Sequence, residues 1–108
     1  MRENPKDLTE VEIQNILHTY EDWKFETKDG ISFFTFSREF KDFKEAFGFI
    51  TKLALVSESL DHHAEIWNVY NKVQLKLFTH ESNSLTTRDR DFITTLMDTQ
   101  NTDRSVNI

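Results

Sequence analysis

Three of the four histidines of this chain bracket one short stretch, Leu60 to His80. Imidazole is the side chain best suited to gain and lose a proton near neutral pH. His62 and His63 are adjacent, and His80 follows a strand-like run. If Trp67–Tyr70 and Val73–Thr79 form a hairpin, the chain goes out and returns, which brings His80 near the other two. The spacing therefore predicts a cluster of three imidazoles.

Three interpretations of such a cluster are open. A zinc site needs three or four ligands, but adjacent histidines diverge and HxH and HExxH are lacking, so Glu58 and Asp61 would have to complete the shell. Acid–base catalysis needs no metal, and Glu58 or Asp61 could fix a tautomer by accepting a ring N–H. The third interpretation is that the histidines are solvated loop residues without a chemical role. The sequence contains no Gly-rich phosphate loop or GxSxG motif that would indicate a different active site.

Composition indicates one domain over residues 1–108, with residues 1–8 and 100–108 expected to be frayed ends. The net charge of −6, without a basic stripe, argues against direct nucleic-acid contact. The absence of cysteine excludes disulfides and zinc–thiolate sites. No apolar run is long enough for a membrane span and no signal peptide is recognisable, so a soluble cytoplasmic protein is expected.

Hydrophobic periodicity predicts three helices. The first begins at Thr9, which forms a capping box with Glu12, and the third begins after Thr86, with Asp89 at its third position. The second follows Asp42 and extends to about residue 60. Its expected apolar face consists of Phe43, Ala46, Phe47, Ile50, Leu53 and Ala54, with Phe49 and Val56 away from the centre of that face.

Alternation predicts strands between these helices. Trp23–Thr27 and Ile31–Phe36 flank the turn dipeptide Asp29-Gly30, which is typical of a hairpin. The run after His63 is either one long strand or two strands joined at Asn71-Lys72. Its residues Trp67, Val69, Val73, Leu75 and Leu77 are expected to share one face. The fold class is therefore α+β: a four-stranded, mainly antiparallel sheet with three helices packed on one face.

Helix 42–60 carries more apolar surface than one small sheet need cover. A helix that is apolar nearly all round is buried on more than one side. The second side is predicted to contact another subunit, the alternative being an oversized core. The excess at Phe47, Phe49 and Val56 suits such an interface.

Four segments together resemble a known family: FKDFKEAFGFITKLAL, LDHHAEIWNVYNKVQLKL, THE and LTTRD. They are similar to the pterin-4a-carbinolamine dehydratases, also called the dimerisation-cofactor family, from about Phe40 to Asp98. The resemblance implies dehydration of 4a-hydroxytetrahydrobiopterin to quinonoid dihydropterin, in support of tetrahydrobiopterin recycling. It implies no metal and no organic cofactor.

The same resemblance implies a catalytic set of His62, His63 and His80. His62 and His80 would be acid–base groups for the two faces of the pterin, and His63 would mainly hold the substrate. The substrate-binding segments would be Asp61 with His62 and His63, and Phe78 with Thr79, His80 and Glu81.

Glu58 and Asp89 match supporting family carboxylates. Glu58 either orients a histidine or is a solvated helix-end acid, and Asp89 either serves the pocket or caps its own helix. Trp67 and Tyr70 are predicted to pack on the sheet and not to stack on pterin. Ala64 stands where the family has proline, and Phe78 stands where a small polar residue is common, which narrows the pocket edge or makes it more apolar.

The resemblance further implies a homodimer or homotetramer, formed through an edge strand and helix 42–60. Some animal relatives also bind a transcription factor, which would add a nuclear location. The alternative function is thus a non-catalytic dimerisation cofactor or transcriptional coactivator acting through the long central helix. The intact imidazole set favours the enzyme, because a scaffold has no need of it.

Overall fold

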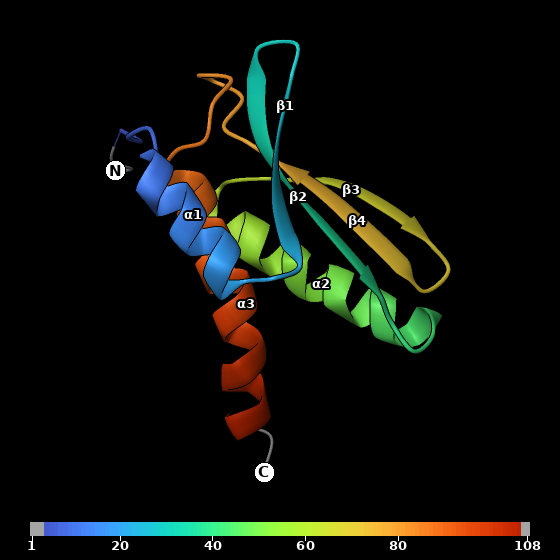
Figure 1. Ribbon diagram of the computed structural model, residues 1–108. Helices are drawn as coiled ribbons and strands as arrows, with labels where there is room; N and C mark the ends of the chain where they lie inside the picture. Colours follow the sequence, from blue (N-terminus) through green and yellow to red (C-terminus); the bar gives the residue numbers. More distant parts are fainter. Residues whose placement is uncertain (1–3, 107–108) are drawn as a thin grey trace.

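The computed structural model describes residues 4–106 of the chain, with side chains up to residue 98. Within that part the elements are α1 (Glu10–Thr19), β1 (Trp23–Lys28), β2 (Ile31–Glu39), α2 (Phe43–Leu60), β3 (Glu65–Val69), β4 (Lys72–Leu77) and α3 (Thr87–Val106). All the strands belong to one sheet in the order β1-β2-β4-β3, and every neighbouring pair is antiparallel. The helices lie on one side of this sheet (Figure 1). The predicted α+β class is confirmed.

Local hydrogen bonds set the helix ends as the sequence indicates. The Thr9 hydroxyl accepts from the Glu12 backbone N–H at 3.1 Å, and the Glu12 carboxylate accepts from the Thr9 N–H at 2.9 Å. Asp42 caps α2 by accepting from the Glu45 N–H at 2.8 Å. These bonds satisfy backbone donors that the first turn of a helix leaves without a partner.

A tight turn closes each of the two hairpins, β1–β2 and β3–β4. Asp29 and Gly30 both have positive φ, as the turn between β1 and β2 requires. The second turn contains Tyr70 and Asn71, so the run after His63 forms two strands, with the turn one residue earlier than expected.

This turn overturns one expectation about side-chain direction. Val69 pairs with Lys72 and Trp67 with Gln74, so Trp67 and Val69 share a face with residues that point away from the core. Val73, Leu75 and Leu77 are buried against the helices, whereas Trp67 and Val69 are about half exposed. A two-residue turn places an odd-numbered residue opposite an even-numbered one, and the face therefore switches between the strands.

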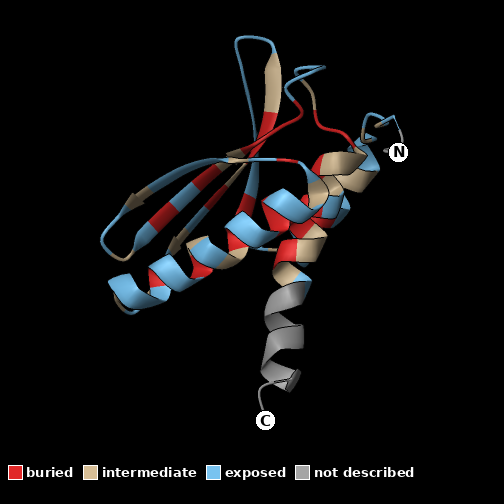
Figure 2. Cartoon of the chain, turned by 180° about the vertical axis from the view of Figure 1, so that it is seen from behind, coloured by how far each residue is buried: buried red, intermediate tan, exposed pale blue. Residues whose placement is uncertain are grey.

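The buried face of α2 also differs from the prediction. The core receives Ala46, Phe49, Leu53 and Val56, and the Phe49 ring stacks on Phe36 of β2 with centroids 5.2 Å apart. Phe43, Phe47 and Leu55 are 48%, 52% and 68% exposed. Figure 2 shows the resulting alternation of buried and exposed patches along α2. The wide apolar surface of this helix offered two stripes at helical spacing, and contact with the sheet selected the one through Phe49.

The segment before α1 is held against the start of α3. The Leu8 N–H donates to the Leu85 carbonyl and the Thr87 N–H donates to the Lys6 carbonyl, both at 2.9 Å. Residues 6–8, within the segment expected to fray, bond to the start of α3, and α3 extends as a helix to Val106. The expectations for residues 1–3 and 107–108 lie outside the described residues. None of the helices in the described part is long and apolar enough to cross a membrane.

Candidate active site

The three histidines that bracket β3 and β4 line one cavity. It has a volume of about 230 Å³, and its walls are Asp61, His62, His63, His80 and Glu81. The expected cluster of imidazoles is thus present. His62 and His63 follow the end of α2, and His80 follows the end of β4. The two segments meet at the cavity because the β3–β4 hairpin returns the chain to the place where β3 begins.

The end of α2 positions the first two histidines. Asp61 adopts the left-handed conformation with φ 50°, and the His62 N–H donates to the Ser57 carbonyl at 3.0 Å. This arrangement stops the helix and turns the chain toward β3. His62 thereby lies in the interior while His63 lies at the surface.

A buried carboxylate fixes His62. His62 Nε2 lies 2.7 Å from Asp89 Oδ1, the imidazole is 6% exposed and Asp89 is fully buried. The Phe92 ring meets the imidazole edge-to-face with centroids 6.0 Å apart. An ionised carboxylate only accepts hydrogen bonds, so Nε2 carries the hydrogen and Nδ1 is the nitrogen left for other chemistry.

Asp89 also accepts hydrogen bonds from two other residues. Asp89 Oδ2 accepts from the Thr79 hydroxyl at 2.8 Å and from the Thr86 backbone N–H at 2.8 Å. The Thr86 hydroxyl lies 2.6 Å from the Thr79 hydroxyl and accepts from the Arg88 N–H at 3.2 Å. The Thr79 hydroxyl donates its hydrogen to Asp89, so the Thr86 hydroxyl must be the donor in its bond with Thr79. Each of these three side chains therefore has a hydrogen-bond partner. Asp89 therefore caps the start of α3 and also bonds to His62.

His63 has a similar but exposed partner. Its Nε2 lies 2.8 Å from Glu58 Oε2, and the two side chains are 58% and 79% exposed. Glu58 is four residues before His62 on the last turn of α2 and does not line the cavity. Such a pair in contact with water is a weak tether compared with the buried bond to His62.

His80 is supported by a ring. The centroids of His80 and Phe78 are 4.2 Å apart with an angle of 40° between the planes. Phe78 is buried and, like Thr79, it is not part of the cavity wall. These two members of the expected substrate-binding segments lie behind the wall, where Phe78 supports His80 and Thr79 supports Asp89.

The two exposed aromatics of the β3–β4 hairpin lie elsewhere. Trp67 lines a shallow hollow on the open face of the sheet, and Tyr70 is in the turn and 62% exposed. Neither lines the histidine cavity. Trp67 lies against other residues of the sheet on the face away from the helices and is 47% exposed.

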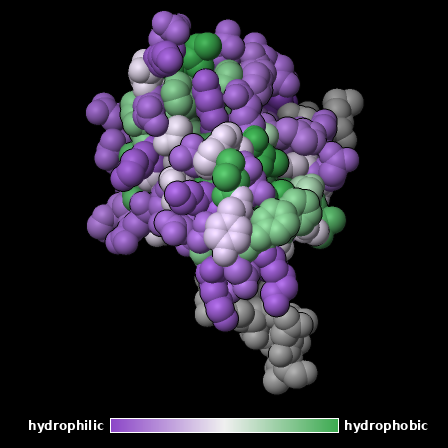
Figure 3. Space-filling model, turned by 90° about the vertical axis from the view of Figure 1, so that its right-hand side faces the viewer, coloured by the Kyte–Doolittle hydropathy of each residue, from purple (hydrophilic) through white to green (hydrophobic). Residues whose placement is uncertain are grey.

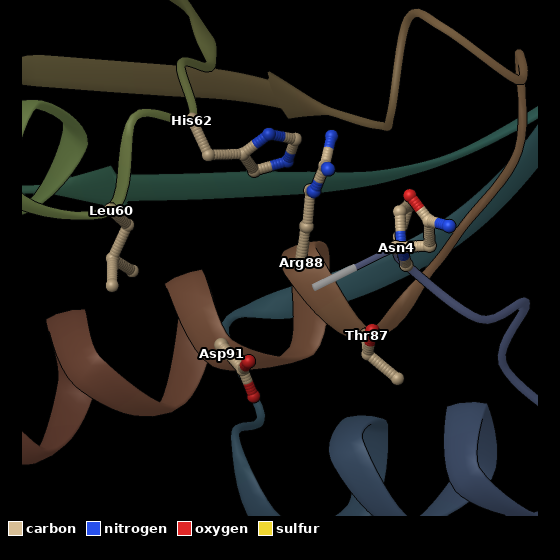
Figure 4. A pocket seen from close by; sticks show the side chains of 7 residues that line it. Asn4, Leu60, His62, Thr87, Arg88 and Asp91 are labelled. Carbon is tan, nitrogen blue, oxygen red and sulfur yellow. The ribbon is translucent and has the colours of Figure 1, made fainter. Parts of the chain in front are cut away.

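Sequence reasoning missed the hydrogen bonds by which Thr79 and Thr86 support Asp89, and it missed a second cavity beside His62. This cavity, of about 220 Å³, is lined by Asn4, Pro5, Leu60, His62, Thr87, Arg88 and Asp91 (Figure 4). The Arg88 guanidinium lies 3.6 Å from Glu81, and its buried Nε has no hydrogen-bond partner. Thr79 follows the end of β4, and its type gives no sequence signal for this role, because its partner Asp89 is on another element.

The site offers imidazole nitrogens in three different environments, together with the carboxylates of Asp61 and Glu81. Among the described residues, no three histidine, aspartate or glutamate side chains are grouped as metal ligands. The arrangement can donate a proton to one atom of a small polar ligand and accept a proton from another.

This chain is similar to known proteins over most of its length. Residues 6–98 match the family model described as "Pterin 4 alpha carbinolamine dehydratase". The chain is 44% identical over 82 residues to proteins of Brucella ovis and Brucella melitensis biotype 1, each named "Putative pterin-4-alpha-carbinolamine dehydratase". That match covers 76% of this chain and 82% of each relative.

A solved structure from Brucella melitensis, of a protein described as a transcriptional coactivator/pterin dehydratase, has the same fold. The TM-score is 0.74 at 39% identity, and the match covers 86% of this chain and 97% of that one. The chain therefore belongs to the pterin-4a-carbinolamine dehydratase family, a family of hydro-lyases.

Proposed function

We propose that this protein dehydrates 4a-hydroxytetrahydrobiopterin to quinonoid dihydropterin by histidine general acid–base catalysis, and so supports tetrahydrobiopterin recycling. The carbon–oxygen bond at C4a breaks and its oxygen leaves as water after taking a proton. The N5 proton departs, and a C4a=N5 double bond forms. The overall reaction is the loss of one water molecule, so it needs no redox partner.

The observation that carries this proposal is the single cavity lined by His62, His63 and His80. One imidazolium can protonate the departing hydroxyl while one neutral imidazole accepts the N5 proton. General acid–base help of this kind contributes roughly 10²–10⁴-fold to a rate.

The supports of the rings suggest how the work is divided. His62 Nε2–H donates to Asp89, which stabilises the positive charge that the ring gains when Nδ1 takes a proton. His80 and His62 act as the acid–base pair for the two faces of the pterin, and the exposed His63 helps to hold the substrate. The carboxylates of Asp61 and Glu81 accept from the amino and N–H groups of the pyrimidine ring.

The decisive experiment follows the decay of the carbinolamine by stopped-flow absorbance, with and without the protein. We expect the protein to accelerate the decay in proportion to its concentration. A decay rate that does not depend on the protein would overturn the proposed activity.

We also propose that the protein assembles through α2 and an edge strand as a homodimer or homotetramer. Figure 3 shows apolar side chains among hydrophilic ones on the side of the molecule where α2 begins and the β3–β4 turn lies. Phe43 and Phe47 of α2 are about half exposed, and their rings contact each other with centroids 5.5 Å apart. Exposed aromatics at helical spacing are typical of a helix–helix interface.

The second candidate function is that of a dimerisation cofactor or transcriptional coactivator acting through the same face of α2. The exposed aromatics of α2 favour it, and the similar protein from Brucella melitensis is described as a transcriptional coactivator as well as a dehydratase. A protein with this role alone would keep its binding to a partner when His62→Gln, which keeps a donor to Asp89, is combined with His80→Ala.

A further inference from the structure

We propose that Phe78 is a positioning residue that holds the His80 ring in place for proton transfer. The inference rests on the proposed function, since the orientation of His80 matters to a rate only if this ring exchanges a proton with the substrate. Its structural basis is the contact between the two rings, whose centroids are 4.2 Å apart and whose planes meet at 40°. Aromatic pairs at such distances are attractive when the rings are offset or tilted.

His80 differs from the other two histidines in what orients it. His62 bonds to Asp89 at 2.7 Å and His63 to Glu58 at 2.8 Å. Within the described part of the chain, His80 has no hydrogen-bond or ion-pair partner, and Phe78 is its ring contact. Imidazole torsions are broad, so a ring without an anchor would sample several orientations. Phe78 therefore does for His80 what a carboxylate does for each of the others.

Phe78 is itself held firmly enough to serve as a platform. It is 6% exposed, and it follows directly after Leu77, the last residue of β4. The Lys76 ammonium lies 4.3 Å from the centre of the Phe33 ring and 5.7 Å from that of Phe78, so the lysine links the two rings. A side chain that is locked by packing can in turn lock a reactive group that rests on it.

Hydrogen bonds also hold the backbone that follows Phe78. The Thr79 N–H donates to the Ser84 carbonyl at 2.9 Å, and the Ser82 and Ser84 N–H groups donate back to the Thr79 carbonyl. The Thr79 side chain is fixed by Asp89 on the inner side. The main chain at residue 79 is thus anchored on both sides, and the remaining freedom of His80 lies in its side-chain torsions, which the Phe78 face restricts.

A ring contact suits a group that must change its charge. A carboxylate would occupy one imidazole nitrogen and favour the protonated ring, whereas a stacked ring leaves both nitrogens of His80 free. An aromatic face attracts an imidazolium by its quadrupole and also stacks on the neutral ring. Phe78 can therefore hold His80 in the same place before and after it exchanges a proton.

The kinetic test compares Phe78→Leu and Phe78→Met, which remove the aromatic face, with Phe78→Tyr, which keeps it. We expect the first two to lower kcat by roughly 10- to 100-fold with little change in KM, because a misplaced catalytic group loses up to about 10²-fold in rate. Phe78→Tyr should retain most of the activity. Phe33→Leu is the matched control. Phe33 is about as buried as Phe78 and its ring also contacts the Lys76 ammonium, but it does not stack on His80. An unchanged kcat in both Phe78→Leu and Phe78→Met would overturn the proposal.

The second measurement needs no substrate. In the wild-type protein the ring current of Phe78 should shift the NMR signals of the His80 ring protons upfield, and His80→Ala assigns those signals. The shift should disappear in Phe78→Leu and Phe78→Met and persist in Phe78→Tyr and Phe33→Leu. Signals that stay in place without the aromatic face would show that His80 is held by something else.

The two levels of failure can be told apart. A wild-type protein that does not accelerate carbinolamine decay refutes the proposed function, while the NMR shifts still decide whether Phe78 orients His80. An active wild type whose kcat is insensitive to loss of the Phe78 ring refutes the positioning role alone. Urea unfolding of each variant identifies any loss of rate that comes from loss of fold, because Phe33→Leu should be destabilised to a similar degree.

Discussion

His62 and Asp89 are 27 residues apart in the chain, yet Nε2 of the imidazole lies 2.7 Å from the carboxylate, and both residues are buried. One side chain is placed by the end of α2 and the other by the start of α3. The bond therefore joins two helices as well as two functional groups.

Asp89→Asn should lower kcat/KM of carbinolamine dehydration by about 10²-fold or more, in the range that general acid–base groups contribute. Asp89 accepts hydrogen bonds from His62, Thr79 and Thr86, and an amide cannot accept all of them or balance a charged imidazole. The measurement is the steady-state rate of dehydration. Asp91→Asn, an exposed carboxylate on the same helix, is the control and should keep the wild-type rate.

His62→Ala should destabilise the fold far more than His63→Ala. Removing one partner of a buried pair leaves an uncompensated carboxylate and costs about 3 kcal/mol or more in the free energy of unfolding. An exposed pair such as His63 with Glu58 contributes less than about 1 kcal/mol. Urea unfolding followed by circular dichroism gives both values, and equal losses would show that burial does not distinguish the two pairs.

Replacing His62 and His80 together should abolish the catalysed rate. His62→Gln is the better choice at the buried position, because the glutamine amide can still donate to Asp89 and so keeps the carboxylate paired. Combined with His80→Ala, it removes both proposed proton-transfer groups. Stopped-flow decay of the carbinolamine should then equal the decay without protein. A double variant as fast as wild type would contradict the mechanism.

The capping box of α1 should stabilise the folded protein less at acid pH than at neutral pH. The backbone N–H of Thr9, followed by its side chain, lowers the pKa of Glu12 by hydrogen bonding to the charged form. Because the folded-state pKa lies below the unfolded value, this stabilisation is complete above the unfolded pKa and is lost as pH falls through the folded one. The Tm difference between wild type and Glu12→Gln should therefore be largest at neutral pH and shrink in acid. A difference that is constant across that range would contradict it.

Phe47→Glu should reduce the molecular mass in solution if α2 forms the subunit interface. Phe47 is 52% exposed, so a charge there is tolerated by the monomer but not inside a contact between apolar helix faces. Light scattering coupled to size-exclusion chromatography measures the mass. Val11→Glu, at an exposed position on α1, serves as the control and should leave the mass unchanged. An oligomer that survives Phe47→Glu would place the interface elsewhere.

Features that depend on neighbouring residues could be predicted from the sequence. The capping box of Thr9 and Glu12, the Asp42 cap and the Asp29-Gly30 turn are made within a few residues, so the residue types alone indicate them. The cluster of His62, His63 and His80 was also predictable, because it needs only a hairpin of matched strands. The resemblance of the chain to a known family could also be recognised, because it rests on segments whose residues can be compared one by one.

Features that depend on contacts between distant elements could not be predicted in this way. The helix spacing of α2 allowed two apolar stripes, and packing against Phe36 decided that Phe49 faces inward and Phe47 outward. A one-residue difference in the β3–β4 turn decided the face of Trp67.

By itself, then, the sequence determined the elements, their order and the set of imidazoles, since these follow from local periodicity and from residue identity. Only the tertiary structure decided which partner orients each ring: a buried carboxylate for His62, an exposed one for His63 and the Phe78 ring for His80. The physical reason is that Asp89 comes from a separate helix, and its distance from His62 depends on how α2 and α3 pack together in three dimensions.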